Sequence, residues 1–384
     1  MKWHNPGHEF DNVYKSMVEK EEFYFFCAGD YGKQFLPIME KEINIKGYID
    51  NNPDKQRTGY EGYTCYSLDQ IDFSAGKTGI VITVSQMQRS PIVEQLKKTG
   101  YEKDKDFFII EEFLSVYFVY KYNKVYFSSI SFLPSTACNL KCKACLNFNP
   151  FAKHFYVREW EQIKADIDLF FKCVDHIMLF HVSGGEPMLY KHIAKVIDYL
   201  DKNYGDKIDT LRTVTNGTVI PDDNTLEVLS KCNVEITVDD YREAVPQYND
   251  KFDLLLKKLD EYNIRYYINY ASEWIDLAPD RTDFSKASEE QMIKHFDSCC
   301  QSWQELRDGK LFSCNYDAYA TVAGINKEPD DEVFDLRKYS QSLKRQLVEF
   351  RLGYNAKGYT NFCRKCMGIS NKNPYKVIPA EQKK

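Results

Sequence analysis

Two series of short apolar runs alternate with amphipathic stretches along this chain of 384 residues. In the first series the runs are four to eight residues long and rich in β-branched and aromatic residues, which predicts buried strands. The stretches between them carry apolar residues at helical spacing. The predicted strands lie at 22–26, 45–52, 79–85 and 106–113, and the main predicted helices at 27–41 and 90–100. This order predicts a small parallel sheet with helices that ends near residue 115.

The second series begins with an apolar run at 124–134 and is longer and more regular. Four further strand patterns follow at 176–184, 209–217, 234–240 and 264–270, separated by helix patterns at 158–174, 192–203, 224–232 and 253–262. Five strands that alternate with four helices predict an incomplete α/β barrel. In such barrels the functional residues lie in loops at the carboxyl ends of the strands.

The pattern changes near residue 297, where the segments shorten and cysteines become frequent. A stretch at 308–324 resembles a hairpin, a helix is predicted near 332–350, and we expect the last residues, 378–384, to be frayed. The predicted organisation is therefore α/β with three parts: a Rossmann-like domain at 1–118, a partial barrel at 124–290 and a small cysteine-rich domain at 291–384.

Composition narrows the class of protein. The formal net charge is −6 and no basic stripe is present, which argues against nucleic acid as a partner. The first residues lack a charged start followed by an apolar run, and no window is long enough to span a bilayer. We therefore expect a cytoplasmic protein. In that reducing compartment its 12 cysteines indicate metal binding rather than disulfides.

Three of the cysteines, Cys138, Cys142 and Cys145, follow the first barrel strand within eight residues. Thiolates are ligands for zinc and for iron–sulfur clusters. Because a four-iron cluster takes four ligands, three thiolates leave one iron open for a small molecule. The alternatives are a zinc site or buried thiols, but no fourth cysteine or histidine lies close in sequence.

With its C-x3-C-x2-C spacing this triplet resembles the cluster motif of the radical S-adenosylmethionine (SAM) superfamily. Three further segments at predicted strand ends follow in that family's order: "SGGEP", "TVTNG" and "ITVDD". The resemblance implies a [4Fe–4S] cluster on the triplet, and an enzyme that makes a 5′-deoxyadenosyl radical from SAM. The implied SAM contacts are Gly184, Gly185, Glu186, Pro187, Thr215, Asn216, Thr237 and Asp239. One departure is Ala144, which stands where the family usually has an aromatic residue near the adenine.

The remaining cysteines of the last part, Cys299, Cys300, Cys314, Cys363 and Cys366, resemble the twitch or SPASM extension of radical SAM enzymes. Because the full SPASM form needs about seven cysteines, the resemblance implies the twitch form with one auxiliary [4Fe–4S] cluster. Neighbouring side chains of an extended segment point in opposite directions, so only one of Cys299 and Cys300 should be a ligand, with Cys299 favoured. A zinc ribbon is the alternative.

The first part resembles the Rossmann-like domains appended to sugar-modifying enzymes. Gly29 and Gly32 keep two places of the G-x-G-x-x-G pattern, whereas Cys27 occupies the first, and Asp50 ends the second strand where a ribose-binding acid would stand. This domain is expected either to recognise a nucleotide or sugar-linked substrate or to be a scaffold without a ligand. A working NAD site is the third alternative.

Together these features predict a radical SAM oxidoreductase or isomerase that oxidises or epimerises a sugar or nucleotide-linked sugar, in carbohydrate biosynthesis. The expected cofactors are two [4Fe–4S] clusters and SAM, with an electron donor such as flavodoxin or ferredoxin as partner. A peptide-modifying maturase and a zinc-stabilised binding module without enzymatic activity remain alternatives. The residue that exchanges a proton is unassigned, although His181, Arg212 and Tyr270 lie at or near strand ends.

Overall fold

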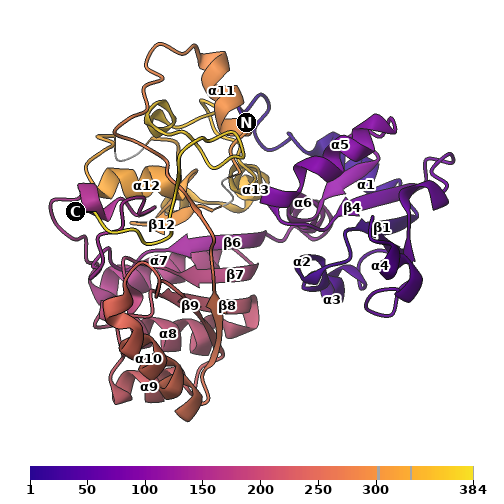
Figure 1. Cartoon of the computed structure of the whole chain (residues 1–384). Helices are drawn as coiled ribbons and strands as arrows, with labels where there is room; N and C mark the ends of the chain where they lie inside the picture. The colour runs from indigo at the N-terminus through magenta and orange to yellow at the C-terminus, as the bar shows by residue number, and fades with distance from the viewer. Residues whose placement is uncertain (301–302, 329–330, 384) are drawn as a thin grey trace. The chain divides into compact units, whose positions relative to one another are not determined.

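The computed structural model describes residues 1–300, 303–328 and 331–383. It divides the chain into two compact units. We call residues 5–124 the head unit, and residues 1–4 with 125–384 the barrel unit. In Figure 1 the head unit is indigo to purple, and the barrel unit runs from magenta to yellow.

The head unit is built on a five-stranded parallel sheet with the strand order β3-β2-β1-β4-β5. This order reverses direction between β1 and β4, as in doubly wound α/β sheets, where ligands bind at the switch point. The elements are α1 (Asp11–Val18), β1 (Glu22–Phe26), α2 (Asp30–Lys33), α3 (Leu36–Met39), β2 (Ile45–Ile49), α4 (Pro53–Thr58), β3 (Cys65–Tyr66), β4 (Thr78–Ile82), α5 (Ser90–Lys98), β5 (Phe107–Ile109) and α6 (Ile110–Tyr122).

The strand predicted at 106–113 is only partly correct. Strand β5 ends at Ile109, and the next residue begins the 13-residue helix α6. The buried side chains of α6 include Phe113, Leu114 and Val116, so the helix is apolar on more than one side. Such an apolar helix cannot be separated from a buried strand by periodicity alone, which explains the error.

The barrel unit contains an eight-stranded sheet with the order β10-β9-β8-β7-β6-β12-β13-β14. Strands β6 to β10 are parallel, as expected for a partial barrel. Its first elements are β6 (Tyr126–Phe132), α7 (Trp160–Cys173), β7 (His176–Val182), α8 (Ile193–Tyr204), β8 (Ile208–Thr215), α9 (Asp223–Leu229), β9 (Val234–Asp239), α10 (Asn249–Glu261) and β10 (Arg265–Asn269). Figure 1 shows α8, α9 and α10 beside strands β7 to β9.

One face of this sheet is buried by apolar side chains of the helices. Phe170 of α7 packs edge-on against Phe127 of β6 and Phe180 of β7. In the second half of β8, Leu211, Thr213 and Thr215 are buried, whereas the residues between them are only partly buried. Because strand side chains alternate, those intervening residues project from the opposite face of the sheet.

The last part of the chain extends the same sheet. Its elements are β11 (Trp274–Ile275), α11 (Glu289–Asp297), β12 (Glu305–Arg307), β13 (Lys310–Phe312), α12 (Asn315–Val322), β14 (Val333–Asp335), α13 (Lys344–Arg351) and β15 (Lys376–Val377). Strand β12 pairs with β6 in parallel through Glu305 and Ser131. This part therefore belongs to the same compact unit as the barrel.

The hairpin predicted at 308–324 lies earlier than expected. It is formed by β12 and β13, joined by Asp308 and Gly309, both of which have positive φ. An Asp-Gly pair is a typical hairpin turn because both residues adopt this conformation readily. Residues 315–322 form helix α12, not the second strand.

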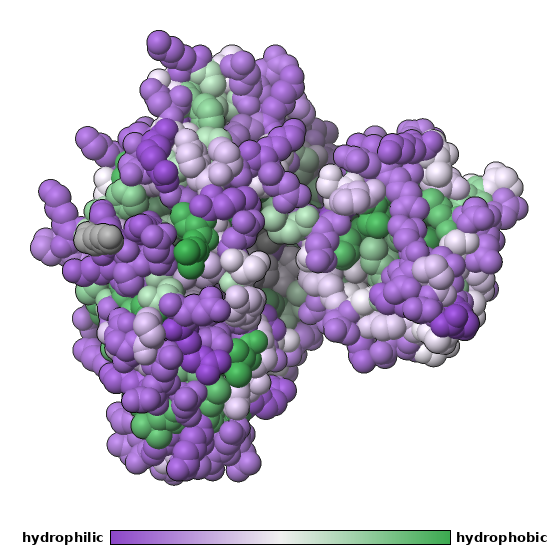
Figure 2. Space-filling view, in the orientation of Figure 1, coloured by the Kyte–Doolittle hydropathy of each residue, from purple (hydrophilic) through white to green (hydrophobic). Residues whose placement is uncertain are grey.

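The expectation that residues 378–384 are frayed is wrong for the described residues up to 383. Ala380 is fully buried, and the backbone of Glu381 and Lys383 is hydrogen-bonded to the loop that carries the first three cysteines. No helix among the described residues is long and apolar enough to cross a membrane. The face in Figure 2 is mainly hydrophilic, with apolar residues in separate patches.

Candidate metal and cofactor site

The first three cysteines lie together in the loop after β6. They share a cluster with Leu140, and burial raises the pKa of Cys138 to about 12 and that of Cys142 to about 11. The pKa of Cys145 is raised for the same reason. Buried thiols become thiolates only beside a positive partner, and metal ligation supplies one. The donor set therefore fits a metal cluster.

The cysteine loop is held against the segment that follows β7. The Gly185 N–H donates to the Ser135 carbonyl at 2.9 Å, and the Glu186 N–H donates to the Ala137 carbonyl at 2.7 Å. A Cβ atom at Gly185 would lie 2.2 Å from the Thr136 carbonyl oxygen. Only glycine allows this approach, so the sequence "GG" fixes the distance between the two loops.

Glu186 is a buried carboxyl group at the centre of this arrangement, only 1% exposed. One carboxyl oxygen accepts the Met188 N–H at 3.0 Å and the other accepts the Asn216 N–H at 2.7 Å. Burial raises its pKa to about 7, and none of the interactions found to act on it comes from a cationic side chain in the described part of the chain. A buried acid without a positive partner is costly, so the site favours a cationic ligand.

The loop after β8 reaches the same place. The Asn216 side-chain amide donates to the Cys138 sulfur at 3.8 Å and to the Asn139 side-chain oxygen at 3.1 Å. The Asn139 side-chain amide in turn donates to the Thr218 hydroxyl at 2.7 Å. The structure thus brings the cysteine loop, Glu186 and the "TNG" segment together.

Strand β9 contributes polar groups of two kinds. The buried hydroxyl of Thr237 has no hydrogen-bond partner among the described residues. Asp239 accepts hydrogen bonds from the Tyr241 hydroxyl and the Asn269 amide, both at 2.7 Å, and burial raises its pKa. A small pocket of about 160 Å³ lies where β8 and β9 end, lined in part by Asn216, Tyr241 and Phe252.

The helix-free face of strands β7 to β10 carries a group of polar residues. His181 is in register with Arg212, which pairs with Glu235 at 2.7 Å and lies 5.3 Å from the centre of the Tyr267 ring. We call His181, Arg212, Glu235 and Tyr267 the polar face. Burial and the Arg212 charge lower the pKa of His181 to about 4, so this side chain is neutral at pH 7.

Two aromatic residues extend the picture of this region. The His181 ring lies 5.4 Å from the ring of Trp303, which belongs to the last part of the chain. Tyr270, a residue predicted from its place at a strand end, is 64% exposed. The polar face therefore has aromatic rings beside paired charges, a combination suited to orienting a polar organic molecule.

A second group of cysteines forms in the last part of the chain. Burial raises the pKa of Cys314, Cys363 and Cys366. The nearby Cys299 thiol raises the pKa of all three further, and Cys363 does the same for Cys314 and Cys366. The Ile369 N–H donates to the Cys299 sulfur at 3.3 Å, and the Gly368 N–H to the Cys366 sulfur at 3.3 Å.

Cys300 differs from its neighbour in what it contacts. Its backbone N–H donates to the Ile369 carbonyl at 2.6 Å. The Cys299 thiol acts electrostatically on Cys314, Cys363 and Cys366 and raises the pKa of each of them. Cys299 therefore lies close to the other three thiols.

No group of three or more His, Cys, Asp or Glu side chains in residues 1–300, 303–328 and 331–383 converges tightly around a single metal ion. Zinc would need such convergence, because its bonds to sulfur are about 2.3 Å long. The ligands of a four-iron cluster bind four different iron atoms, so their sulfurs lie farther apart.

A chain of buried and partly buried hydroxyl groups runs from the segment after β7 to helix α12. Ser183, directly before the "GGEP" residues, contacts Ser131 at 3.1 Å through their hydroxyl oxygens. The Ser131 hydroxyl contacts that of Tyr319 at 2.6 Å, and Tyr319 donates to the Glu305 carboxyl at 3.2 Å. Burial raises the pKa of Glu305 to about 8. These groups can hold a proton between the first loop and α12.

In the head unit the predicted residues have clear structural roles. The Asp50 carboxyl accepts the Ala28 N–H at 2.9 Å and lies 3.3 Å from the Lys55 ammonium, so it fastens the turn after β1. A Cβ at Gly32 would lie 2.7 Å from the Thr83 Cβ, so glycine is needed for close packing of α2. Gly29 faces open space instead.

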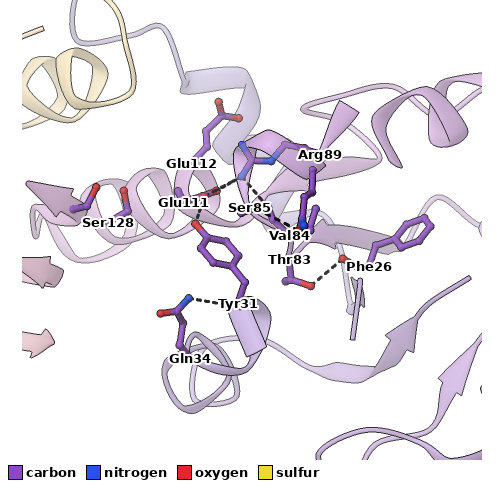
Figure 3. Close-up of polar contacts among 12 residues, drawn as sticks. Phe26, Tyr31, Gln34, Thr83, Val84, Ser85, Arg89, Glu111, Glu112 and Ser128 are labelled. Carbon is purple, nitrogen blue, oxygen red and sulfur yellow. Dashed lines mark hydrogen bonds and ion pairs between the residues drawn. The ribbon is translucent and has the colours of Figure 1, made fainter. Parts of the chain in front are cut away.

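A polar cluster, drawn in Figure 3, lies near the carboxyl ends of β1 and β4. Arg89 forms a two-fold contact with the Glu111 carboxylate at 2.8 and 2.9 Å, and the Tyr31 hydroxyl donates to the same group. The Thr83 hydroxyl donates to the Phe26 carbonyl at 2.9 Å. These hydrogen bonds and the ion pair stabilise the switch point between β1 and β4 of the head sheet.

The comparisons with known proteins give the class of the central segment. Residues 132–270 match the family model described as the Radical SAM superfamily. These residues are therefore a radical SAM domain, the kind of domain that catalyses the reactions of that superfamily. No match was found among curated proteins.

Solved structures similar to this chain include anSMEcpe with bound AdoMet and the Kp18Cys peptide, at 22% identity and a TM-score of 0.32. The match covers 38% of this chain and 43% of that one. Streptococcus suis SuiB bound to S-adenosylmethionine matches at 19% identity and a TM-score of 0.29, and the match covers 48% of this chain and 39% of that one. BtrN in complex with AdoMet and 2-DOIA matches at 14% identity and a TM-score of 0.38, and the match covers 65% of this chain and 97% of that one. The chain thus aligns with less than half the length of anSMEcpe and SuiB.

Three features of the site were missed from the sequence. Tyr319 belongs to the segment predicted as a hairpin, 308–324, and Glu305 lies just before that segment, so the burial of these two residues was not expected. Gln382 lies in the residues expected to be frayed, yet its side-chain amide donates to the Cys142 sulfur at 3.4 Å. Two of the three residues of strand β12, "ELR", are charged, so the local sequence gave no signal that Glu305 is buried.

Proposed function

We propose that the barrel unit is a radical SAM enzyme. It holds a [4Fe–4S] cluster on Cys138, Cys142 and Cys145 and binds SAM beside Glu186. The observation that carries this proposal is the buried Glu186, which accepts the N–H groups of Met188 and Asn216, has a raised pKa, and lies next to the cysteine loop through its own backbone N–H. An α-ammonium group is a cation that would complete it, with a charge-assisted hydrogen bond.

When bound, the cluster and SAM supply a 5′-deoxyadenosyl radical that removes a hydrogen atom from a substrate C–H bond. The chain's own residues bind and orient. The Glu186 carboxylate accepts a hydrogen bond from the ammonium group of SAM. Gly185 keeps the segment after β7 in contact with the cysteine loop. The Thr237 hydroxyl, which has no hydrogen-bond partner in the described part of the chain, and the carboxyl of Asp239 offer hydrogen bonds to hydroxyl groups of the ligand.

We further propose that Cys299, Cys314, Cys363 and Cys366 hold an auxiliary [4Fe–4S] cluster. Three buried thiols and the partly buried Cys299, which come from three segments of the chain, support this assignment. With all of its iron atoms ligated by protein, such a cluster would accept an electron from the substrate rather than anchor it. That role suits a two-electron oxidation.

For the substrate we propose a sugar or a nucleotide-linked sugar. The polar face supports this choice because its opposite charges pair with each other and leave a neutral, hydrogen-bonding surface beside the aromatic rings of Tyr267 and Trp303. The head unit, with the strand order of a nucleotide-binding sheet, would recognise the linked portion. A peptide is the alternative that the experiment must exclude.

Anaerobically reconstituted protein tests the proposal. We expect about eight iron atoms per chain, and formation of 5′-deoxyadenosine that a nucleotide sugar stimulates and a peptide does not. Cys142→Ala should abolish this product. Glu186→Gln should weaken SAM binding by ~1–3 kcal/mol, the scale of a lost charged hydrogen bond. A colourless protein with stoichiometric zinc would show that the chain is a zinc-stabilised module instead.

A further inference from the structure

We infer that residues 376–383 form a strap that positions the cysteine loop, and that Gln382 is a positioning residue that tunes the cluster proposed there. This inference rests on the proposed function for its redox part only. The strap residues lie far from the cysteine loop in sequence, and each part of the contact is visible in the structure.

The strap begins with a firm anchor. Strand β15 pairs antiparallel with β11, with Trp274 opposite Val377 and Ile275 opposite Lys376. The Asp276 N–H donates to the Tyr375 carbonyl at 3.0 Å just before the strap begins. The chain leaves this two-stranded sheet in a fixed direction, so the residues that follow reach the cysteine loop without a flexible spacer.

The strap then packs on the loop. Ala380 is fully buried and belongs to one apolar cluster with Leu140, Cys142 and Val245, with Cys138 packed against it. Since Ala380 has a positive φ of 56°, the backbone turns at this residue. A methyl side chain fits this position, and a larger one would lift the strap from the loop.

Two backbone hydrogen bonds bracket Cys142. The Lys143 N–H donates to the Glu381 carbonyl at 2.7 Å, and the Lys383 N–H donates to the Lys141 carbonyl at 2.7 Å. Cys142 and Gln382 thus face each other as partners in a short antiparallel bridge. This pairing sets the register of the middle cysteine with respect to the strap.

The side chain of Gln382 completes the contact. Its carbonyl oxygen accepts the Lys141 N–H at 2.8 Å, and its amide nitrogen donates to the Ala380 carbonyl at 2.6 Å and to the Cys142 sulfur at 3.4 Å. Hydrogen bonds to the sulfur ligands are one of the means by which a protein sets the potential of an iron–sulfur cluster. A donor stabilises the more negative, reduced state, so it raises the potential.

The strap also connects the two cysteine groups along the chain. Between Cys366 and Gln382 the buried Asn373 amide donates to the Gly368 carbonyl at 2.9 Å and to the Asp276 carbonyl at 3.0 Å. The path from one cysteine group to the other is therefore fastened at its middle.

An EPR-monitored redox titration of the reconstituted full chain tests the role of Gln382. Gln382→Leu removes the donor and should shift the reduction equilibrium of the cluster about tenfold toward the oxidised form, which equals 59 mV for one electron. Gln382→Glu should shift it in the same direction. Glu381→Gln is the matched control: it removes the ion pair with Lys143 and keeps the backbone bonds, so its potential should not fall below that of the wild type.

Metal-free protein provides a second test that does not depend on the cluster. Ala380→Leu should increase the rate at which iodoacetamide alkylates Cys142 at least tenfold, measured by mass spectrometry, with the buried Cys173 as internal reference. Equal alkylation rates in both proteins would refute the strap. Potentials in both Gln382 variants equal to the wild type would refute the tuning role. A wild type without any cluster signal would instead refute the proposed function.

Discussion

Gly185→Ala tests the contact on which the candidate site depends. A Cβ at this position would lie 2.2 Å from the Thr136 carbonyl oxygen and 2.4 Å from that of Ala137. Cβ atoms essentially never approach other atoms closer than 3.0 Å, so one loop must retreat by about 0.8 Å. Overpacking costs about 1–3 kcal/mol, and the two backbone hydrogen bonds that join the loops contribute about 1 kcal/mol each. We expect a destabilisation of about 3–5 kcal/mol.

Thermal unfolding followed by circular dichroism measures this effect. For a unit of this size 1 kcal/mol corresponds to about 2–3 °C, so the melting temperature of the barrel unit should fall by about 6–15 °C. Hydrogen exchange should show faster exchange at the amides of Gly185 and Glu186, because their partners have moved.

The neighbouring Gly184→Ala is the matched control. Its Cβ would lie 3.0 Å from the Ser135 carbonyl oxygen and 3.4 Å from the Pro187 ring, contacts that a small shift relieves. We expect a loss of about 1 kcal/mol or less. If both variants unfold at the same temperature as the wild type, the close approach of the two loops is wrong, and the reason given for the glycine pair is wrong with it.

Three further predictions concern other parts of the chain. Burial raises the pKa of Glu305 to about 8, so the native state binds this proton more tightly than the unfolded state, and the free energy of unfolding should fall as pH rises from about 4.5 to 8. Glu305→Gln should reduce this pH dependence, measured by urea unfolding. An unchanged pH dependence would contradict the burial of that carboxyl. Cys27 has a φ of 88°; Cys27→Gly should stabilise the head unit by about 1 kcal/mol, whereas Cys27→Ala, which keeps the strain, should not. Cys299→Ser should lower the iron content from about eight to about four atoms per chain, and Cys300→Ser should leave it unchanged; the reverse result would exchange the two assignments.

The sequence was sufficient for the elements whose patterns are local. The strands of the barrel follow apolar runs bounded by polar turns, and the amphipathic helices α7, α8 and α10 have the spacing of one buried face. The motif cysteines could be proposed as ligands because ligand spacing is also a local property. Errors occurred where burial depends on distant partners, as in α6 and α12, whose residues lack a polar face that would mark them as helices.

The cysteine loop shows most clearly why the rest could not be predicted. It has no helix or strand of its own between β6 and the short turn at Asn149–Phe151, so its shape must be imposed from outside. Asn216 contacts the sulfur of Cys138, Gln382 contacts that of Cys142, and Gly185 holds the backbone before them. These three residues come from segments about 50 to 240 residues away. The sequence implied Gly185 and Asn216 only as contacts of SAM, and it gave no sign of Gln382. A pattern of ligands can therefore be recognised from sequence, whereas the contacts that orient those ligands are defined only by the fold.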